Sequence, residues 1–458
     1  MHDSEQAATR AAQATQATQA TQPVGALRRR TLAVGGLAAG LLAACGGSGG
    51  SSDGASNVRM VNATTGYPSL DLAIGTVTVN QGLTIGSVGA YASVANTALS
   101  TVVTATGSAA ALSSITRTFL KDAHYALVTY GAAGALKTAL IPEDVAAAAA
   151  TQASLQVMNL ASDAGALDIY LTGSTDLLDS ATANVASVAA GSTAAYSTLT
   201  AATYRLRVTG PGDKTDLRLD VPGLALASTQ VATLILSQGA GGVMVNGLLL
   251  LQQGAATALA NTRARVRLVS GVAGGAVVTA SVGGVTVASG VGSPYLPPGY
   301  TQVGASAQAP VALAVGPLNG AQVAVAVPNQ ALAAGGDYTL LVWGSVAAPQ
   351  VTLVTDDNRF PTVAGSAKLR LVNVTTGAPA AMTLKADFSA VASSVAQGQA
   401  SAYGNVSAST SARLDVVSAG SSALIAPLTG IPLVAKGLYT MYMVGDSAAP
   451  VGQFTRER

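Results

Sequence analysis

The segment Val58-Arg59-Met60-Val61-Asn62 decides the fold, because the chain repeats it three more times. The copies are Leu155-Gln156-Val157-Met158-Asn159, Val266-Arg267-Leu268-Val269-Ser270 and Leu369-Arg370-Leu371-Val372-Asn373. Their spacing of about 100 residues is the size of a small domain. The sequence therefore predicts a tandem array of similar domains.

A second landmark lies near the end of each repeat. Tyr125, Tyr338 and Tyr439 each follow an apolar residue (Phe119, Leu332, Leu433) six positions earlier and precede a glycine (Gly131, Gly344, Gly445) six positions later. In repeat two the pattern degrades, and Val231 and Ser237 take the tyrosine and glycine places. The spacing suits a tyrosine corner, in which the hydroxyl bonds backbone just upstream, or a tyrosine that simply begins a strand.

Period-two alternation predicts short strands. In residues 204–209 Tyr204, Leu206 and Val208 share a face, and residues 216–221 alternate in the same way. The turn sequence 210–214 between them predicts an antiparallel hairpin, with outward arginines that meet Asp216 or Asp220.

Strands this short over about 100 residues are typical of an immunoglobulin-like sandwich. We therefore expect an all-β protein of four tandem immunoglobulin-like antiparallel β-sandwich domains that follow a disordered signal and tether segment. The expected parts are a signal peptide (1–44), a lipidated cysteine with a Gly/Ser tether (45–56) and sandwiches at 57–143, 154–252, 263–355 and 367–458. The expected linkers begin at Asp144, Gly254 and Asp356 and run to residues 150, 262 and 366.

Cys45 is the only cysteine and ends the run Leu42-Ala43-Ala44-Cys45. Three arginines at 28–30 and an apolar stretch at 32–44 precede it, the pattern of a secretory signal peptide that is too short to span a bilayer. The run resembles a bacterial lipobox, which implies that Cys45 is lipidated and becomes the mature N-terminus. By the same resemblance, Gly46 after the cysteine favours the outer membrane. Residues 29–32 partly resemble a twin-arginine export motif, so Sec and twin-arginine export both stay open.

The charge balance bears on partners. After residue 44 the chain carries equal numbers of acidic and basic residues, so it lacks the basic footprint that nucleic-acid binding needs. The expected partner is a membrane, through the N-terminal lipid anchor, with a protein or glycan ligand left unidentified.

The repeats resemble the bacterial secreted domain-of-unknown-function family 4397. Its domains open with Val-Arg-Val-Val-Asn/His-Ala-Ser/Thr, followed by a small-residue loop and an apolar-Asp-apolar strand, and residues 58–72 match this well. Residues 155–171 and 369–379 match moderately, while the third repeat lacks the Asn and the Asp but keeps Tyr295-Leu296-Pro297-Pro298-Gly299-Tyr300. The resemblance implies the fold and transfers no catalytic residue.

His124 is the only histidine after Cys45 and is the candidate for a catalytic triad, paired with Asp122 and a serine. The other repeats argue against this, because Asp337 and Leu438 take the same place. We interpret the position as the entry from a loop into a strand, and we expect no catalytic residue, no cofactor and no enzymatic activity.

The remaining acidic clusters are interpreted as turns or strand contacts. No Cys/His cluster suits zinc, and the oxygen-rich groups do not match a calcium loop; they are Asp176 with Asp179, Asp213 with Asp216, and Asp356-Asp357-Asn358. Asp71 and Asp168 lie in apolar strands and are expected to face outward or to bond a neighbouring loop. Trp343 is the single tryptophan and is expected to be buried, on the strand face opposite Tyr338.

These features favour a non-enzymatic envelope lipoprotein that presents tandem sandwiches for structural or binding roles at the cell surface or in the periplasm. A carbohydrate-binding or adhesion module is the first alternative, which the low aromatic content of 4% disfavours. A hydrolase on a sandwich scaffold is the second.

Overall fold

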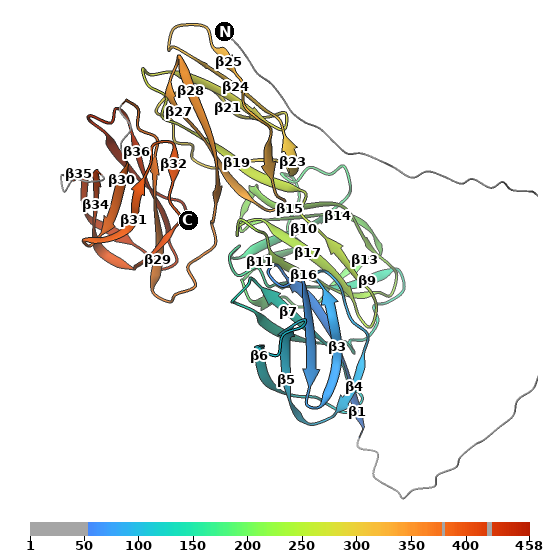
Figure 1. Ribbon diagram of the computed structural model, residues 1–458. Helices are drawn as coiled ribbons and strands as arrows, with labels where there is room; N and C mark the ends of the chain where they lie inside the picture. The colour runs from blue at the N-terminus through green and yellow to red at the C-terminus, as the bar shows by residue number, and fades with distance from the viewer. Residues whose placement is uncertain (1–53, 378–380, 419–423) are drawn as a thin grey trace, which may run out of the picture. The chain divides into compact units, whose positions relative to one another are not determined.

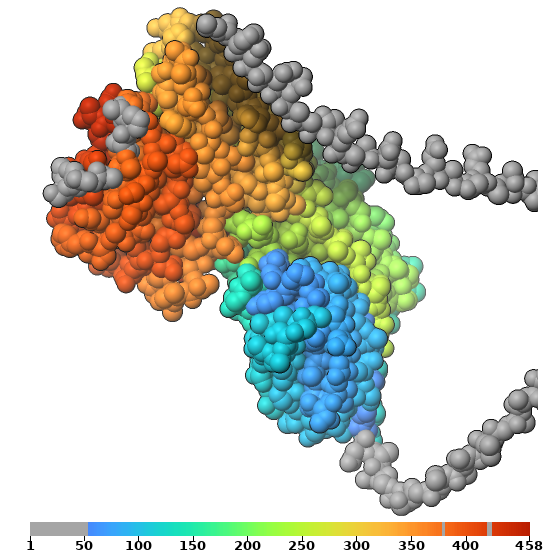
Figure 2. All heavy atoms as spheres, in the orientation of Figure 1, coloured from blue at the N-terminus to red at the C-terminus, as the bar shows by residue number. Residues whose placement is uncertain are grey.

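The computed structural model describes residues 54–377, 381–418 and 424–458, and within them every regular element is a strand. The strands form four successive sandwiches, which Figure 1 colours from blue (β1) to red (β36) along the chain. Figure 2 shows the same view with all heavy atoms as spheres. The protein is therefore all-β with repeated sandwich domains, as the sequence predicts.

The first sandwich contains β1 (Ala55–Thr64), β2 (Ser69–Ile74), β3 (Val77–Thr84), β4 (Ala92–Ala95), β5 (Ala98–Ala105), β6 (Ala111–Thr118), β7 (His124–Gly131) and β8 (Lys137–Pro142). The second contains β9 (Gln152–Asn159), β10 (Leu167–Thr172), β11 (Val185–Val188), β12 (Ser192–Thr193), β13 (Ser197–Thr200), β14 (Ala202–Gly210), β15 (Asp213–Leu226), β16 (Val231–Gln238), β17 (Val245–Leu251) and β18 (Ala256–Leu259). The third contains β19 (Arg263–Ser270), β20 (Val277–Val282), β21 (Val285–Gly292), β22 (Thr301–Gly304), β23 (Ser306–Ala309), β24 (Val311–Gly316), β25 (Val323–Val325), β26 (Gln330–Leu332), β27 (Asp337–Ser345) and β28 (Ala348–Asp356). The fourth contains β29 (Ser366–Asn373), β30 (Met382–Ala386), β31 (Ser389–Val395), β32 (Gln399–Ala400), β33 (Gly404–Ser407), β34 (Ser409–Ser418), β35 (Leu424–Leu433), β36 (Leu438–Val444) and β37 (Val451–Arg456).

Each sandwich is built from two principal sheets, and the strand orders of these sheets recur from one sandwich to the next. In the first sandwich the orders are β4-β1-β7-β8 and β3-β2-β5-β6. The first strand of every repeat pairs in parallel with a late one: β1 with β7, β9 with β16, β19 with β27 and β29 with β36. This one pairing departs from the antiparallel order of the other strands, because the chain crosses to the second sheet and back before the late strand joins the first, in the same direction.

Each sandwich has its own core, made by alternating side chains of the facing sheets. In β2 the buried positions are Leu70, Leu72 and Ile74, and the residues between them are partly exposed. They pack against Val58 and Met60 of β1 in the opposite sheet. Burial of each such side chain stabilises the fold by about 1.5–3 kcal/mol, so the alternation in the sequence is the main determinant of the sandwich.

The predicted hairpin at 204–221 is confirmed as β14 and β15, which pair in antiparallel order. Outside the core, the Arg205 guanidinium donates to both carboxylate oxygens of Asp220 across the strands, at 2.8 and 2.6 Å. Asp216, the other expected partner, instead accepts from Arg218 on its own strand.

The tyrosine corner is confirmed in three repeats. The hydroxyls of the three landmark tyrosines accept a backbone N–H five residues upstream: Leu120 N to Tyr125 at 3.3 Å, Ala333 N to Tyr338 at 2.8 Å and Val434 N to Tyr439 at 2.8 Å. The bond closes the turn that leads into the late strand, so the tyrosine is more than a strand starter.

In repeat two the landmark is one residue later than the sequence comparison places it. Leu155 pairs with Ala232, as Val58 pairs with Tyr125, so Ala232 rather than Val231 takes the tyrosine place. Gln238 likewise replaces Ser237 in the glycine place. The physical reason is the register of the parallel pair, in which the landmark must face the core, and Ala232 does. In this register Leu226 becomes the apolar residue six positions earlier, and it is buried.

Two expected linkers contain ordered sheet residues. Within residues 254–262 the strand β18 pairs with β17, which covers a sheet edge that would otherwise expose its backbone groups. Asp356, where the last linker was expected to begin, is the final residue of β28 and is buried.

A candidate binding cleft and the charged sandwich junctions

The predicted lipidation site lies outside the described residues. This concerns Cys45 and the lipobox residues Leu42, Ala43 and Ala44.

His124 is the first residue of β7, which confirms its interpretation as the entry into a strand. Its Nδ1 lies 2.9 Å from an oxygen of Asp144, and its Nε2 lies 3.3 Å from the amide nitrogen of Asn57. Its ring also meets Tyr91 edge-on, with 5.3 Å between the ring centroids. Asp144 rather than Asp122 is therefore its acidic partner, and the imidazole connects the start of β7 to the segment after β8.

The strand aspartates bond neighbouring loops, as expected. Asp71 accepts from the backbone N–H of Gly82 at 2.6 Å and from the Thr106 hydroxyl at 2.8 Å. Asp168 accepts from the backbone N–H groups of Ser187 and Gly212, at 2.6 and 2.8 Å. Both carboxylates satisfy backbone donors at bends of the adjacent strands, which is a structural role.

Two of the three oxygen-rich groups of the sequence contain turn aspartates, whereas the turn interpretation is wrong for Asp356, which ends β28 and accepts from Arg370 of the fourth sandwich. Asp213 accepts from the backbone N–H and the hydroxyl of Thr215, and Asp176 accepts from the backbone N–H of Gly173. Among the described residues, no three His, Cys, Asp or Glu side chains gather as a metal site would require.

The asparagine of the repeated motif is a buried connection between the two sheets. The amide of Asn62 donates to the Leu83 carbonyl at 3.0 Å, while its oxygen accepts the Thr64 N–H at 3.1 Å. Asn159 makes the same type of bonds, to the Val188 carbonyl and from the Ala161 N–H. The motif is thus explained by the fold, since a buried amide needs several partners.

The outer face of the first-strand sheet is apolar, and it is buried between the first and second repeats and between the third and fourth. Val61 and Val128 of the first sandwich pack with Met158 and Ile235 of the second in one cluster. A separate cluster joins the third and fourth sandwiches, with Val269, Leu341, Val372, Val374, Tyr442 and Val444 as its buried members. The first strands are therefore buried on both faces.

Trp343 belongs to the second of these clusters. It is partly buried, where the sequence predicts burial, and it lies on the face opposite Tyr338. A Cβ at Gly398 of the fourth sandwich would lie 2.1 Å from Cε2 of the indole, so only a glycine leaves space for the ring. The tryptophan thus packs in the contact between the third and fourth sandwiches.

Buried ions accompany the apolar contact between the first two sandwiches. Arg59, at the second position of the motif, is 3% exposed and forms a bidentate ion pair with Glu143, which follows β8. Its guanidinium also donates to the carbonyls of Leu251 and Gly254 in the second repeat. Tyr91 donates to Glu143 at 2.5 Å and stacks on Arg59, 4.9 Å from the ring centroid.

Between the third and fourth sandwiches, each motif arginine bonds a carboxylate of the other sandwich. Arg267 of the third donates to Glu457 of the fourth at 2.6 and 3.0 Å, and Arg370 of the fourth donates to Asp356 of the third at 2.6 Å. The arginines stack on Tyr300 and Tyr403, which lie 4.6 Å away in each case.

Repeat two replaces both charges of this arrangement with amides. Gln156 stands at the arginine position, and Gln252 pairs with no acid but bonds the backbone of Val145 in the first repeat. Gln252 follows Leu251, the partner of Ala232, just as Glu143 follows Pro142, the partner of Tyr125. Gln252 is therefore the equivalent of Glu143, and repeat two lacks the acid as well as the arginine. A lone buried charge is thereby avoided.

Burial and the neighbouring charges shift the pKa values of the groups in this contact between the third and fourth sandwiches. Desolvation, and then the charge of Asp356, raises the pKa of Tyr300 well above its ordinary value. Burial likewise raises the pKa of Tyr403 to about 12, against the lowering effect of Arg370. Burial would raise the pKa of Glu457 as well, but the hydrogen bonds and charge of Arg267 outweigh it and lower that pKa. The tyrosines are therefore neutral and Glu457 is a carboxylate at neutral pH, and Tyr300 donates its hydroxyl proton to Asp356.

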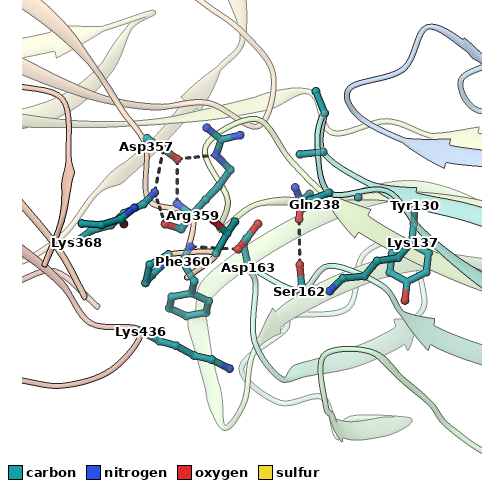
Figure 3. A pocket seen from close by; sticks show the side chains of 17 residues that line it. Tyr130, Lys137, Ser162, Asp163, Gln238, Asp357, Arg359, Phe360, Lys368 and Lys436 are labelled. Carbon is teal, nitrogen blue, oxygen red and sulfur yellow. Dashed lines mark hydrogen bonds and ion pairs between the residues drawn. The ribbon is translucent and has the colours of Figure 1, made fainter. Parts of the chain in front are cut away.

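A polar cleft of about 550 Å³ opens beside these junctions (Figure 3). Its walls come from the β7–β8 loop, from loops of the second and fourth sandwiches and from the segment 357–362. The side chains that carry charge or an aromatic ring are Tyr130, Lys137, Asp163, Asp357, Arg359, Phe360, Lys368 and Lys436.

Internal ion pairs hold one wall of the cleft. Asp357 accepts from Arg359 Nε at 2.6 Å and from Lys368 Nζ at 3.1 Å, and Lys368 also donates to the Arg359 carbonyl at 2.8 Å. The Phe360 N–H donates to Asp163 at 3.1 Å. Burial raises the pKa of this aspartate, against the lowering effect of the Phe360 N–H and then of Arg359.

Sequence reasoning missed both the junctions and the cleft. The signal for the junctions was present, because Val61 and its equivalents make the outward face of the motif apolar and Arg59 recurs as Arg267 and Arg370. The cleft had no such signal, since its walls come from four separate parts of the chain. Across the described ranges, no helix has the length and apolar character to cross a membrane.

Comparison with known proteins places the repeats in a family. The model of a domain of unknown function, DUF4397, matches residues 56–170 and 264–384, more than half of the chain. Each match begins in the first strand of an odd-numbered repeat and ends in the second strand of the next, β10 or β30. No curated protein matches the chain. The chain therefore belongs to the DUF4397 family, as a member with tandem repeats.

Proposed function

We propose that this protein is a non-enzymatic lipoprotein of the bacterial cell envelope, which presents its sandwiches for structural or binding roles at the cell surface or in the periplasm. The observation that carries the proposal is the way in which successive sandwiches are joined. Apolar outer faces and buried arginine–carboxylate pairs connect the first repeat to the second and the third to the fourth. Such apolar, charge-paired contacts favour a stiff array of presented sandwiches over domains that move independently.

The anchor in this proposal is Cys45. Its lipobox resemblance and the Gly/Ser stretch that follows it are suited to a lipid-held chain whose sandwiches stand away from the bilayer. Gly46 favours the outer membrane as the location.

The geometry of His124 favours a role without catalysis. Both ring nitrogens lie against other groups, Asp144 and Asn57, and neither of these is a serine hydroxyl. A serine hydrolase needs the second nitrogen free for the nucleophile.

The proposal is tested by Cys45→Ser in the full chain. Wild type is expected to incorporate radiolabelled palmitate and to sediment with outer-membrane vesicles, whereas the variant should do neither. Ser48→Ala, three residues away, is the matched control and should behave as wild type. Membrane fractionation of Cys45→Ser at the wild-type level would contradict the proposal.

A further inference from the structure

The cleft of Figure 3 holds more positive charge than its own acids neutralise. Four cations line it, and Asp357 is already shared by two of them, Arg359 and Lys368. Lys137 and Lys436 have no ion-pair partner among the described residues. Their side chains reach toward one another from opposite sides of the cleft in Figure 3, one from the first sandwich and one from the fourth. An anion bound in the cleft would supply the counter-charge that these two ammonium groups lack.

The other walls suit a ligand that carries hydroxyl groups and a ring. Ser162 and Gln238 share one long hydrogen bond of 3.4 Å and leave further donors and acceptors available. One oxygen of Asp163 accepts the Phe360 N–H, and the other can accept a hydroxyl. The Phe360 ring is supported by Arg458, whose guanidinium carbon lies 4.1 Å from the ring centroid.

The size of the cleft exceeds what a small inorganic anion needs. A volume of about 550 Å³ falls within the range of about 300–1,000 Å³ that is typical of sites for organic ligands. A single phosphate would engage the lysines and leave the aromatic and amide walls without contact.

We propose that this cleft binds an acidic oligosaccharide. The acidic group would lie between Lys137 and Lys436, a sugar ring would pack on Phe360, and hydroxyl groups would bond Asp163 and Gln238. The inference deepens the proposed function, since it supplies a ligand class for the binding role at the envelope and rests on that role for its setting.

Calorimetric titration of the full chain tests the proposal. The probes are tetragalacturonate, a sulfated heparin-derived tetrasaccharide, neutral maltotetraose and inorganic phosphate. We expect at least one acidic tetrasaccharide to bind, more weakly as salt is raised because the lysines are solvent-accessible. Maltotetraose should bind at least tenfold more weakly.

The double variant Lys137→Gln/Lys436→Gln should weaken binding of the acidic tetrasaccharide by about tenfold, since two accessible ion pairs are removed. Lys121→Gln/Lys385→Gln removes the same charge from positions outside the cleft and should leave binding unchanged. Phe360→Ala should weaken the tetrasaccharide but leave any phosphate binding as it is.

Four outcomes would overturn the inference: no binding of either acidic tetrasaccharide, equal binding of the neutral one, full competition by phosphate at the concentration of the tetrasaccharide, or wild-type affinity in the lysine double variant. None of these bears on palmitate incorporation at Cys45. The failure of the ligand proposal is therefore distinguishable from the failure of the anchoring proposal.

Discussion

Tyr338 shows what one side chain contributes at the residue scale. Its ring is part of the third core, and its hydroxyl accepts the Ala333 N–H at 2.8 Å, which closes the turn into β27. Gly336 lies beneath the ring, where a Cβ would be 2.8 Å from Cε2. The tyrosine, the glycine and the turn therefore depend on one another.

We expect Tyr338→Phe to lower the free energy of unfolding by about 1 kcal/mol, because the ring stays in the core but the turn N–H loses its acceptor. The fluorescence of Trp343, the only tryptophan, reports the urea unfolding of this part of the chain. Tyr295→Phe in the same repeat is the control, since its hydroxyl has no hydrogen bond within the described residues. Equal stability of Tyr338→Phe and wild type would rule out a stabilising corner.

Glu457 makes the junction of the last two sandwiches sensitive to acid. Its pKa in the folded protein is below the ordinary value of 4.5, so its contribution is complete above that pH and is lost as the pH falls through the lower folded value. We expect the urea midpoint, followed by Trp343 fluorescence, to fall below about pH 4.5.

Glu457→Gln should be less stable than wild type at pH 7 by about 3 kcal/mol, because Arg267 then loses the carboxylate that it hydrogen-bonds and keeps only the more distant Asp356 at 3.9 Å. Its stability should also change less between pH 6 and pH 3.5 than that of wild type. An identical pH dependence in the two proteins would show that Glu457 is not part of the acid response.

At the scale of elements, the first strand of each repeat has two buried faces. One face of β1 carries Val58 and Met60 into its own core, and the other carries Arg59 and Val61 to the neighbouring repeat. The cost of a buried guanidinium is offset by a carboxylate at the end of the last strand. Repeat two shows that two glutamines, Gln156 and Gln252, also fit this place.

The arginine and its acid should therefore be replaceable only together. We expect Arg59→Gln alone to cost about 3–5 kcal/mol, since Glu143 stays buried without its ion-pair partner. The double variant Arg59→Gln/Glu143→Gln, which imitates repeat two, should recover about 1–3 kcal/mol relative to the sum of the single changes. The measurement is a double-mutant cycle from urea unfolding followed by circular dichroism. Additive single effects would refute the coupling.

At the scale of the whole molecule, the buried apolar contacts between repeats fall into two groups. Separate apolar clusters join the first repeat to the second and the third to the fourth. Both family matches begin at the start of a pair and extend into its second member.

We expect Val372→Asp to destabilise the third and fourth sandwiches selectively, because it places an unpaired carboxylate in a contact where Val372 is 1% exposed. Scanning calorimetry should then show a lowered transition for this pair beside an unchanged one for the first pair. Ser393→Asp, at an exposed position of β31 on the second sheet of the same sandwich, adds the same single charge and is the control. A uniform downward shift of the whole profile would show that the four repeats unfold as one unit.

Much of the fold was predictable from the sequence, since it rests on local patterns. Period-two alternation determined the hairpin at β14 and β15, and the repeated motif determined the number of sandwiches. The spacing before Tyr338 pointed to the corner, because a hydroxyl and a backbone group five residues apart meet through local geometry alone.

Only the tertiary structure decided which repeat meets which and through which atoms. The parallel pairing of β1 with β7, the exchange of carboxylates between Arg267 and Arg370, and the cleft between Lys137 and Lys436 all join residues far apart in the chain. The alternation of apolar and polar residues along a strand indicates that one face is apolar. It does not indicate whether that face meets the partner sheet or a neighbouring domain. That choice depends on how complete surfaces fit together, which short-range sequence patterns do not encode.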